Sequence, residues 1–482
     1  MLLTLVFAYL LVTIAIGLLA GRRVKNSADF AVAGRHLPLA MIVTTTFATW
    51  FGSETVLGIP ARFIEGGFNG VVEDPFGAGT CLILVGVFFA SKLYRMSLLT
   101  ISDYYRERYG RVVEVVCSLI IMLSYLGWVS AQVTALGLVF NLLSGDVISV
   151  PVGMALGVAS ILAYTLFGGM WSVAVTDFIQ MIILVCGLAV LAYFAGDMAG
   201  GAGKVIDFAT SRDLFRFWPE PSLHDVVFFF AAALTMMLGS IPQQDVFQRV
   251  MSANSLRAAT RGPVIGGVCY IVFAFVPMFL VASALIIMPE RAQALLQDDP
   301  QKILPTLVME RMPFVMQVLF FGALLSAIKS SASATLLAPS VTFTENIWRQ
   351  FRPGGTDRQN LRTMRVTVLV FSLCVLAYAI ASQGTSIYEM VSGAYQVPLV
   401  GAFVPLLAGL YWKRATTQGA IASIALGVGC WLACLATPAG EVVPAQLAGL
   451  LAALIGMGAG SLLPQAVANH RTPHRPVEGL SR

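Results

Sequence analysis

The chain has 482 residues, of which 57% are apolar and 11% are charged, and its formal net charge at pH 7 is +5. The mean hydropathy is +0.81. This composition excludes an ordinary soluble globular protein, in which about 25% of residues are charged, and it predicts a polytopic protein embedded in a lipid bilayer.

Apolar segments recur along the whole chain, and each is long enough to cross a hydrocarbon core of about 30 Å as a helix. They predict an all-α integral membrane protein with thirteen transmembrane helices, in which residues 1–482 form a single transmembrane domain. The predicted helices lie at residues 1–20, 37–58, 75–90, 112–143, 148–166, 171–194, 226–247, 264–288, 313–343, 366–381, 387–410, 419–436 and 443–463.

The distribution of basic residues predicts the topology. The first segment lacks a basic start and an A-x-A cleavage pattern, and the basic stretch GRRVK follows it, so we predict a retained helix rather than a signal peptide. Most of the 30 lysines and arginines lie in one set of alternate loops and in the C-terminal tail. The positive-inside rule therefore predicts a multi-pass protein of the plasma membrane, the inner membrane in bacteria, with its N-terminus outside and its C-terminus cytoplasmic. The same rule accounts for the net charge without a nucleic-acid partner, and the sequence does not indicate an oligomeric state.

Two predicted helices are interrupted by polar or helix-breaking residues. The second contains TTTFATWFGSETVLGIP, and the seventh ends in LGSIPQQDVFQR. Unwound backbone within a bilayer must line protein or a cavity, and paired interruptions in the two halves of a transporter indicate its binding site. The spacing predicts two inverted repeats, residues 37–194 and 226–410. An extra N-terminal helix and inside loop (1–36) precede them, and two C-terminal helices with a short cytoplasmic tail (411–482) follow.

Four stretches of the sequence resemble a known family. The stretch LAYTLFGGMWSVAVTDFIQMI, residues 162–182, resembles the signature region of the sodium:solute symporter family. Further similar stretches are FATWFGSETVLGIP, SIPQQDVFQRVMSA and AIKSSASATLLAPSVTFTENIW. Within the family, these motifs are most similar to those of the choline-transporter-like branch. The resemblance implies a LeuT-like fold with a five-plus-five inverted repeat. It also implies a secondary active transporter, rather than an enzyme, that imports a small solute together with sodium and needs no organic cofactor.

The resemblance also implies a sodium site. Its carbonyl ligands are expected from Ala48, Phe51 and Ala327, and its hydroxyl ligands from Ser330 and Ser331. Sodium binds such oxygens where a membrane helix unwinds. The alternative for the two serines is a hydrogen bond to the carbonyl one turn back in their own helix.

Lys329 lies in the middle of an apolar segment, where a charge costs several kcal/mol and therefore indicates a function or a specific partner. The resemblance places an acid at Asp177, which in some relatives helps to hold a second cation with serines corresponding to Ser330 and Ser333. Here Ala334 follows Ser333, so a conventional second sodium site has lost one possible hydroxyl.

Helical geometry constrains where this lysine points. At 100° per residue, Lys329 is about 200° from Ala327 but about 40° from Ser333. We therefore expect the lysine to pair with Asp177 and to substitute for a second ion. Its charge is either permanent or lost during the transport cycle, which would make the protein proton-coupled. Two alternatives remain: the side chain replaces sodium in the first site as a tethered cation, or the pair is structural without a role in coupling.

The substrate site is expected at the interrupted helices. Trp50 and Trp128 match positions that line an aromatic cage in the choline-transporter-like branch, and aromatic faces attract ammonium groups. Gln243 stands where that branch has tryptophan, and Glu54 stands where it has glycine, while Gln244 offers a further amide. Glu54 can bind a cationic amine, balance the charge of Lys329, or face the outer vestibule, because it lies toward the extracellular half of its predicted helix. We expect a small polar solute that carries an amine.

The remaining charged positions near the membrane have simpler interpretations. Glu73 and Asp74 are expected to be solvated at the outer boundary, and Asp245 and Arg249 to form a local pair at i and i+4. A sensor or a channel is the alternative class of function. The short tail offers no output domain and no filter repeat is visible, so alternating access is favoured.

Overall fold

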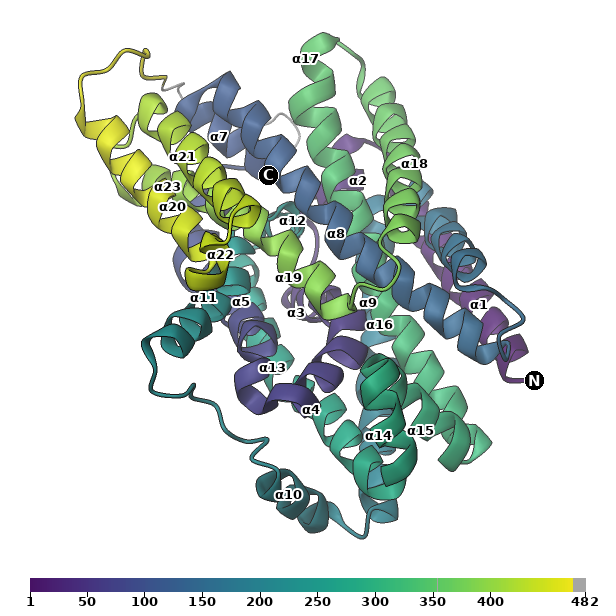
Figure 1. The fold of residues 1–482 in the computed structure, drawn as a ribbon. Helices are drawn as coiled ribbons and strands as arrows, with labels where there is room; N and C mark the ends of the chain where they lie inside the picture. The colour runs from purple at the N-terminus through teal and green to yellow at the C-terminus, as the bar shows by residue number, and fades with distance from the viewer. Residues whose placement is uncertain (353, 471–482) are drawn as a thin grey trace.

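The computed structural model describes residues 1–352 and 354–470, and its described residues fold into a bundle of helices (Figure 1). The α-helices are α1 (Leu2–Gly21), α2 (Ser27–Val32), α3 (Leu39–Trp50), α4 (Ile59–Gly70), α5 (Ala78–Leu84), α6 (Ala90–Arg95), α7 (Ile101–Tyr109), α8 (Arg111–Leu143), α9 (Val150–Met198), α10 (Ala202–Ser211), α11 (Leu223–Gly239), α12 (Gln244–Ser252), α13 (Leu256–Ile287), α14 (Pro289–Asp298), α15 (Ile303–Arg311), α16 (Phe314–Thr342), α17 (Arg349–Phe351), α18 (Asp357–Ala381), α19 (Ile387–Pro398), α20 (Val404–Tyr411), α21 (Thr417–Ala436), α22 (Ala439–Val442) and α23 (Ala445–Leu462). Short 3₁₀ or π-helical turns, η1 (Ala33–Arg35), η2 (Glu54–Gly58), η3 (Val72–Gly77), η4 (Val85–Phe89), η5 (Pro300–Lys302), η6 (Phe343–Trp348) and η7 (Leu399–Phe403), join or interrupt them.

The number of membrane crossings is only partly fixed by helix length. Among the described residues, ten helices are long and apolar enough to cross a membrane, or eleven if α11 and α12, bent by 45°, form one broken span. The predicted count of thirteen therefore stays a prediction. The difference has two causes: α9 joins two predicted helices, and the predicted helix 37–58 is broken, which leaves α3 with only 12 residues.

The 49-residue helix α9 folds back on itself at Gly169, whose φ is +47°. Gly17 of α1 is packed against Tyr164 from the first half of α9, and its carbonyl accepts a hydrogen bond from Ser172 in the second half. Because residues on either side of Gly169 reach the same residue of α1, the two halves lie side by side. A left-handed backbone conformation at this reversal favours glycine.

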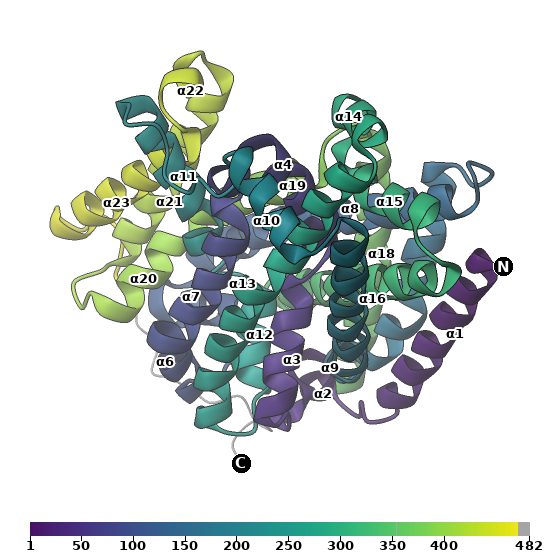
Figure 2. The same ribbon diagram turned by 90° about the horizontal axis from the view of Figure 1, so that it is seen from below.

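The loops rich in lysine and arginine gather at one end of the molecule. The Ser27 backbone N–H donates to the Asp357 carboxylate at 3.2 Å, and Arg35 donates to the Ser97 hydroxyl at 2.7 Å. We call this the inner end, and the opposite one, which carries α4, α10, α14 and α22 in Figure 2, the outer end. The structure thus groups the loops as expected, while the direction of the molecule in the membrane stays a prediction. The last part of the predicted tail, residues 471–482, lies outside the described residues.

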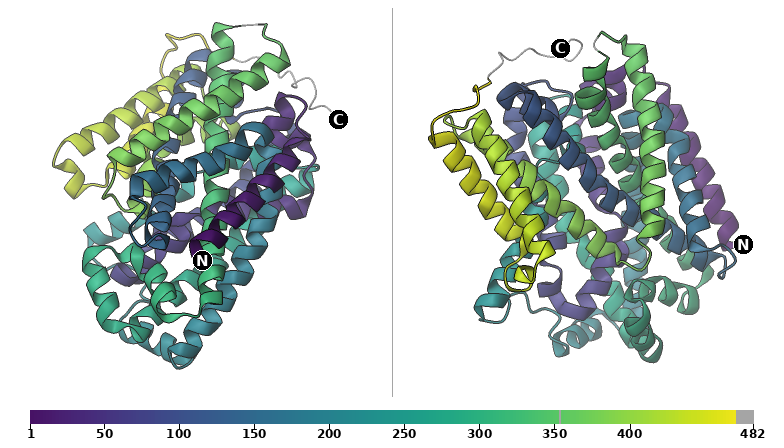
Figure 3. Two further views of the ribbon diagram at one scale, coloured as in Figure 1. Left: turned by 90° about the vertical axis from the view of Figure 1, so that its right-hand side faces the viewer. Right: turned by 45° about the horizontal axis from the view of Figure 1, so that its top comes forward.

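Helix α16 lies at the centre of the bundle. It packs against α9, α8, α18, α3 and α1, and its residues from 323 to 342 are all buried. In contrast, α1 and the pair of α21 and α23 lie at opposite edges of the molecule (Figure 3). A charge on α16 is therefore separated from lipid by other helices, and its partners must come from those helices.

Candidate functional site

Helix α3 stops in the middle of the protein, and this break shapes the site. The helix ends at Trp50, and Phe51 leaves the helical conformation with φ −87° and ψ 69°. The Phe51 backbone N–H still donates to the Phe47 carbonyl at 3.0 Å, and the Thr55 hydroxyl donates to the Trp50 carbonyl at 3.2 Å. The last carbonyls of a helix have no donor within it, so the Ala48 carbonyl is available as a ligand.

The break lies against the serine pair of α16. A Cβ atom placed on Gly52 would lie 2.6 Å from the Ser331 hydroxyl oxygen, so glycine allows α16 to approach the break closely. The Ser331 hydroxyl is buried and has no hydrogen-bond partner among the described residues. A buried hydroxyl normally has a partner, so this oxygen, beside the freed carbonyls of α3, fits a bound cation.

Asp177 ties three helices together next to this serine pair. The fully buried carboxylate of α9 accepts the Thr45 hydroxyl of α3 at 2.5 Å and the Ser330 hydroxyl of α16 at 2.6 Å. The Ser330 oxygen retains a lone pair for a cation while its hydrogen binds Asp177. Four of the expected cation-site residues and Asp177 thus lie where α3, α9 and α16 meet, and Ala327 lies one turn away on α16.

Lys329 points away from this junction, and the expected pairing with Asp177 is not found. Its ammonium donates to the Thr13 hydroxyl of α1 at 2.6 Å and lies 5.2 Å from the centre of the Tyr164 ring. Both oxygens of Asp177 already accept hydroxyls. The ion pairs found among the described residues do not include this lysine.

The rotation of α16 explains the difference. Lys329 shares a helix face with Ser326 and Ser333, as expected from 100° per residue, but that face contacts α1 and the first half of α9. The Tyr9 hydroxyl of α1 lies 2.5 Å from the Ser326 hydroxyl. The Ser333 hydroxyl donates to the Ser330 carbonyl in its own helix at 3.1 Å. Tyr9 and Thr13, at i and i+4 in the predominantly apolar helix α1, were the sequence signal for this partner.

Aromatic side chains pack against one another beside the break, in a cluster that we call the cage. Trp50 contacts Trp128 edge-on with ring centres 6.0 Å apart, and Tyr395 of α19 lies 5.9 Å from Trp50 and 5.2 Å from Trp128. Tyr125 stacks on Trp128 at 6.1 Å, and Tyr270 lies edge-on to Trp50 at 6.5 Å. None of the three central rings is more than 2% exposed, so the cage is occluded in this conformation. The two tryptophans were expected here, and the three tyrosines were not.

A buried acid forms part of the cage. Glu54 is 2% exposed, and its carboxylate accepts the Trp128 indole N–H at 3.1 Å and the Gln132 amide at 2.6 Å. Both donors are neutral, and Glu54 takes part in none of the ion pairs found among the described residues. A buried charge is costly without a counter-charge, so this carboxylate favours a cationic ligand.

The two glutamines of the seventh predicted helix contact different parts of the protein. Gln243 remains near the cage, where its amide donates to the Ser124 hydroxyl at 2.8 Å. Gln244 points elsewhere: its carbonyl accepts the Ile101 backbone N–H at 2.8 Å, at the start of α7. The expectation that Gln244 binds the solute is therefore not supported by its position, because successive residues of a helix point about 100° apart.

Asp245, one residue further on, is a second acid near the cage. Its carboxylate accepts the Tyr125 hydroxyl at 2.6 Å. The expected local pair between Arg249 and this carboxylate is not found. Arg249 instead donates to the Asp245 backbone carbonyl at 2.8 Å and to the Thr49 hydroxyl at 2.7 Å. The arginine therefore joins α12 to α3, the two interrupted elements.

The expectation that Glu73 and Asp74 are solvated is wrong. They are 6% and 1% exposed, because η3 packs into the bundle against α11 and α13. The Asp74 carboxylate accepts the Tyr270 hydroxyl at 2.5 Å, and the same hydroxyl lies 3.0 Å from that of Thr55.

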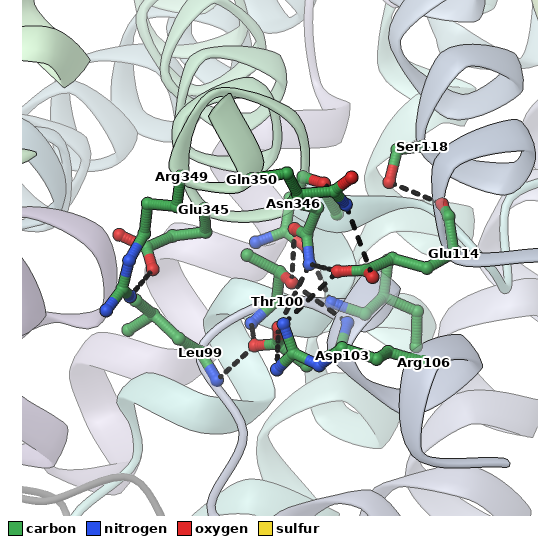
Figure 4. A network of polar contacts seen from close by, with 12 residues as sticks. Leu99, Thr100, Asp103, Arg106, Glu114, Ser118, Glu345, Asn346, Arg349 and Gln350 are labelled. Carbon is green, nitrogen blue, oxygen red and sulfur yellow. Dashed lines mark hydrogen bonds and ion pairs between the residues drawn. The ribbon is translucent and has the colours of Figure 1, made fainter. Parts of the chain in front are cut away.

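A polar network closes the inner end of the bundle, away from the cage (Figure 4). The Asn346 amide of η6, which follows α16, donates to Asp103 of α7 at 2.9 Å and to Glu114 of α8 at 2.8 Å. Arg106 contacts the same two carboxylates at 2.9 and 3.2 Å. The network therefore holds α7, α8 and η6 together at the inner end.

Comparisons with known proteins agree with this geometry. The chain is 27% identical over 445 residues to the high affinity choline transporter 1 of Homo sapiens, with 88% of this chain and 75% of the relative covered. It is 25% identical over 462 residues to the high-affinity proline transporter PutP of Bacillus subtilis, with coverage of 94% and 96%. It is 26% identical over 443 residues to the sodium/sialic acid symporter NanT of Aliivibrio fischeri, with coverage of 88% and 85%.

Solved structures show the same fold. A Na⁺-coupled sialic acid symporter in a substrate-bound outward-open state superimposes with a TM-score of 0.82 at 20% identity, with 96% of this chain and 97% of that chain covered. The nucleobase-cation-symport-1 family transporter Mhp1 superimposes with a TM-score of 0.61 at 14% identity, with coverage of 90% and 95%. The expected all-α, LeuT-like fold class is confirmed.

The family is shown by a match over most of the chain. A model of the sodium:solute symporter family matches residues 30–427, which include both interrupted elements, Asp177 and the serine pair of α16. Members of this family are transporters rather than enzymes. The chain belongs to the sodium:solute symporter family.

Proposed function

We propose that this symporter imports a small solute with a quaternary or protonated amine, together with sodium, by alternating access. The observation that carries the proposal is Glu54, a buried carboxylate inside an aromatic cage whose other partners are neutral. An ammonium group in the cage supplies the missing counter-charge. The relative named as a choline transporter is consistent with such a solute.

The cage suits a cation on physical grounds. A cation over an aromatic face gains about 0.5–2 kcal/mol per ring, and the cage presents Trp50, Trp128 and Tyr395. A carboxylate about 4 Å from the ammonium adds about 4 kcal/mol at an effective dielectric constant of 20, before desolvation is subtracted. Asp245 adds a second nearby acid, which disfavours an anionic solute.

Sodium is proposed to bind where α3, α9 and α16 meet. The Ser331 hydroxyl, the Ser330 hydroxyl and the carbonyls freed at the α3 break are the oxygens that would hold it. When bound there, sodium would join α3 to α16 and so couple ion binding to the position of the break. Lys329 reaches α1 instead, so it modifies the region without replacing sodium. The alternative, in which Lys329 acts as a tethered cation, is decided by the same experiment.

The test uses the melting temperature of the purified full-length protein in sodium or potassium, with and without choline as the probe. A ligand that binds the native state stabilises it by about 2.7 kcal/mol at 100 times its Kd. Sodium is expected to stabilise the wild type and Lys329→Met but not Ser331→Ala. Stabilisation of Lys329→Met alone would establish the lysine as the cation and refute sodium coupling in the native protein.

Choline binding tests the cage separately. Glu54→Gln keeps the shape of the side chain and removes its charge, so choline affinity is expected to fall at least 30-fold, or about 2 kcal/mol. Glu290→Gln, an exposed acid on α14, is the matched control and is expected to bind like the wild type. Equal affinity in Glu54→Gln and the wild type, or no choline binding to either, would refute a cationic solute in this cage.

A further inference from the structure

A cavity lies at the outer end of the molecule. It has a volume of about 250 Å³ and lies between η2 and α4 on one side and α19 on the other. Three acids line it, Glu65, Glu73 and Glu389, whereas Arg62 is its one basic side chain among the described residues. Arg62 is 3.3 Å from Glu65 and also acts electrostatically on Glu73, so the charged side chains of the lining carry an excess of negative charge.

Glu73 is the acid that sets this cavity apart from an ordinary charged surface. It is 6% exposed, and one carboxylate oxygen accepts the Ser392 hydroxyl of α19 at 2.8 Å. The other oxygen is buried and has no hydrogen-bond partner among the described residues, although Glu73 lines the cavity. A buried carboxylate oxygen without a donor is costly, so it favours a ligand that carries positive charge.

One face of α19 contributes to both the cavity and the cage. Tyr388 and Ser392 line the cavity, and Tyr395 forms a wall of the cage. These positions, at i, i+4 and i+7, lie on the same side of a helix. Beside this face, the Asp74 carboxylate follows Glu73 in the chain and binds Tyr270, which lies against Trp50. Carboxylates and aromatic rings therefore alternate from the outer cavity to Glu54.

We propose that this outer cavity is a second binding site for the cationic solute, in which an ammonium group binds the Glu73 carboxylate beside the Tyr388 ring before it reaches the cage. The proposal rests on the function proposed above. An organic ammonium is favoured over a metal ion because no group of three or more potential metal-ligating His, Cys, Asp or Glu side chains is found among the described residues. The site holds the solute while the central cage is occluded.

The test measures the binding of tetramethylammonium to the purified full-length protein in sodium by isothermal titration calorimetry. Glu54→Gln disables the cage and leaves the outer site. We expect this variant to retain a weaker binding step, and Glu54→Gln with Glu73→Gln to lose it, with affinity at least tenfold lower. Glu54→Gln with Glu73→Asp keeps the charge and is expected to bind within threefold of Glu54→Gln alone. Glu54→Gln with Glu290→Gln is the control for surface charge.

The outcomes separate the two proposals. An unchanged residual step after Glu73→Gln, an equal loss in the Glu290→Gln control, or no residual step in Glu54→Gln would each overturn the outer site. A Glu54→Gln variant that binds as tightly as the wild type, while Glu73→Gln abolishes binding, would overturn the cage and leave the outer site. A wild type that binds no tetramethylammonium would overturn both. Melting curves of each variant verify that it is folded.

Discussion

The contact between Lys329 and Thr13 permits a test of why a lysine is tolerated at the centre of the bundle. The Thr13 hydroxyl donates to the Leu10 carbonyl at 2.9 Å and accepts the Lys329 ammonium at 2.6 Å. Thr13→Val keeps the shape of the side chain and removes this acceptor. The ammonium then stays buried, with the Tyr164 ring as its remaining described partner.

The sizes of the opposing effects decide the expected signs. A hydrogen bond to a charged group contributes about 1.5–3 kcal/mol, so Thr13→Val is expected to lower the free energy of unfolding by that amount. Burying an ammonium costs several kcal/mol, and apolar replacement of a buried charge together with its partners is often neutral or stabilising. Lys329→Met is therefore expected to be neutral or stabilising. In the Lys329→Met background, Thr13→Val is expected to change stability by less than about 0.5 kcal/mol, because no ammonium remains.

The assay is a double-mutant cycle on the unfolding of the purified protein. Thr4→Val, on the lipid-exposed side of α1, is the matched control and is expected to be neutral. A coupling energy of at least 1 kcal/mol between Lys329 and Thr13 supports the contact. Equal effects of Thr13→Val in both backgrounds, or a loss of more than about 3 kcal/mol on Lys329→Met, would refute the reasoning and point to another partner for the lysine.

Two further predictions concern stability. Tyr125→Phe is expected to lower the free energy of unfolding by about 1.5–3 kcal/mol, because the Asp245 carboxylate loses its donor. The control Tyr395→Phe removes a hydroxyl that has no described partner, and it is expected to change stability by less than about 0.5 kcal/mol. Equal losses in the two variants would contradict this prediction. Gly169→Ala is expected to cost at least 1–2 kcal/mol, because φ is +47° and the new Cβ would lie 2.4 Å from the Phe30 carbonyl oxygen. The control Gly203→Ala, in an open helical position of α10, is expected to be neutral or stabilising by up to about 1 kcal/mol. A Gly169→Ala protein as stable as the wild type would refute the chain reversal at Gly169.

The broad architecture was predictable because it follows from local patterns. Apolar segments of membrane length predict helices from composition alone, and the polar interruptions predict where they break. The structure has these breaks after Trp50 and between α11 and α12. The two cage tryptophans were also predictable, since one adjoins the first break. Tyr395 was not, because it comes from a helix distant in sequence, and a tyrosine in a membrane helix is commonly an interfacial anchor.

The partners of buried charges were harder to predict, because they depend on how helices rotate against one another. Helix periodicity gave the correct face for Lys329 but could not say which helix covers that face. Glu73 and Asp74 were misplaced for a related reason: they precede a predicted helix, and sequence alone does not show that η3 folds into the bundle. In both cases the missing information was tertiary packing.

Consecutive residues of α16 make contacts on different sides of the helix. Ser330 and Ser331 face Asp177 and the break of α3, whereas Lys329 faces α1, the helix outside the proposed repeats. A movement of the break relative to α16 during transport would remake the contacts of the serines. The lysine contact involves neither the break nor α3, because the Lys329 ammonium binds Thr13 of α1. The lysine contact thus joins α1 to α16, whereas the proposed sodium site lies on another face of α16.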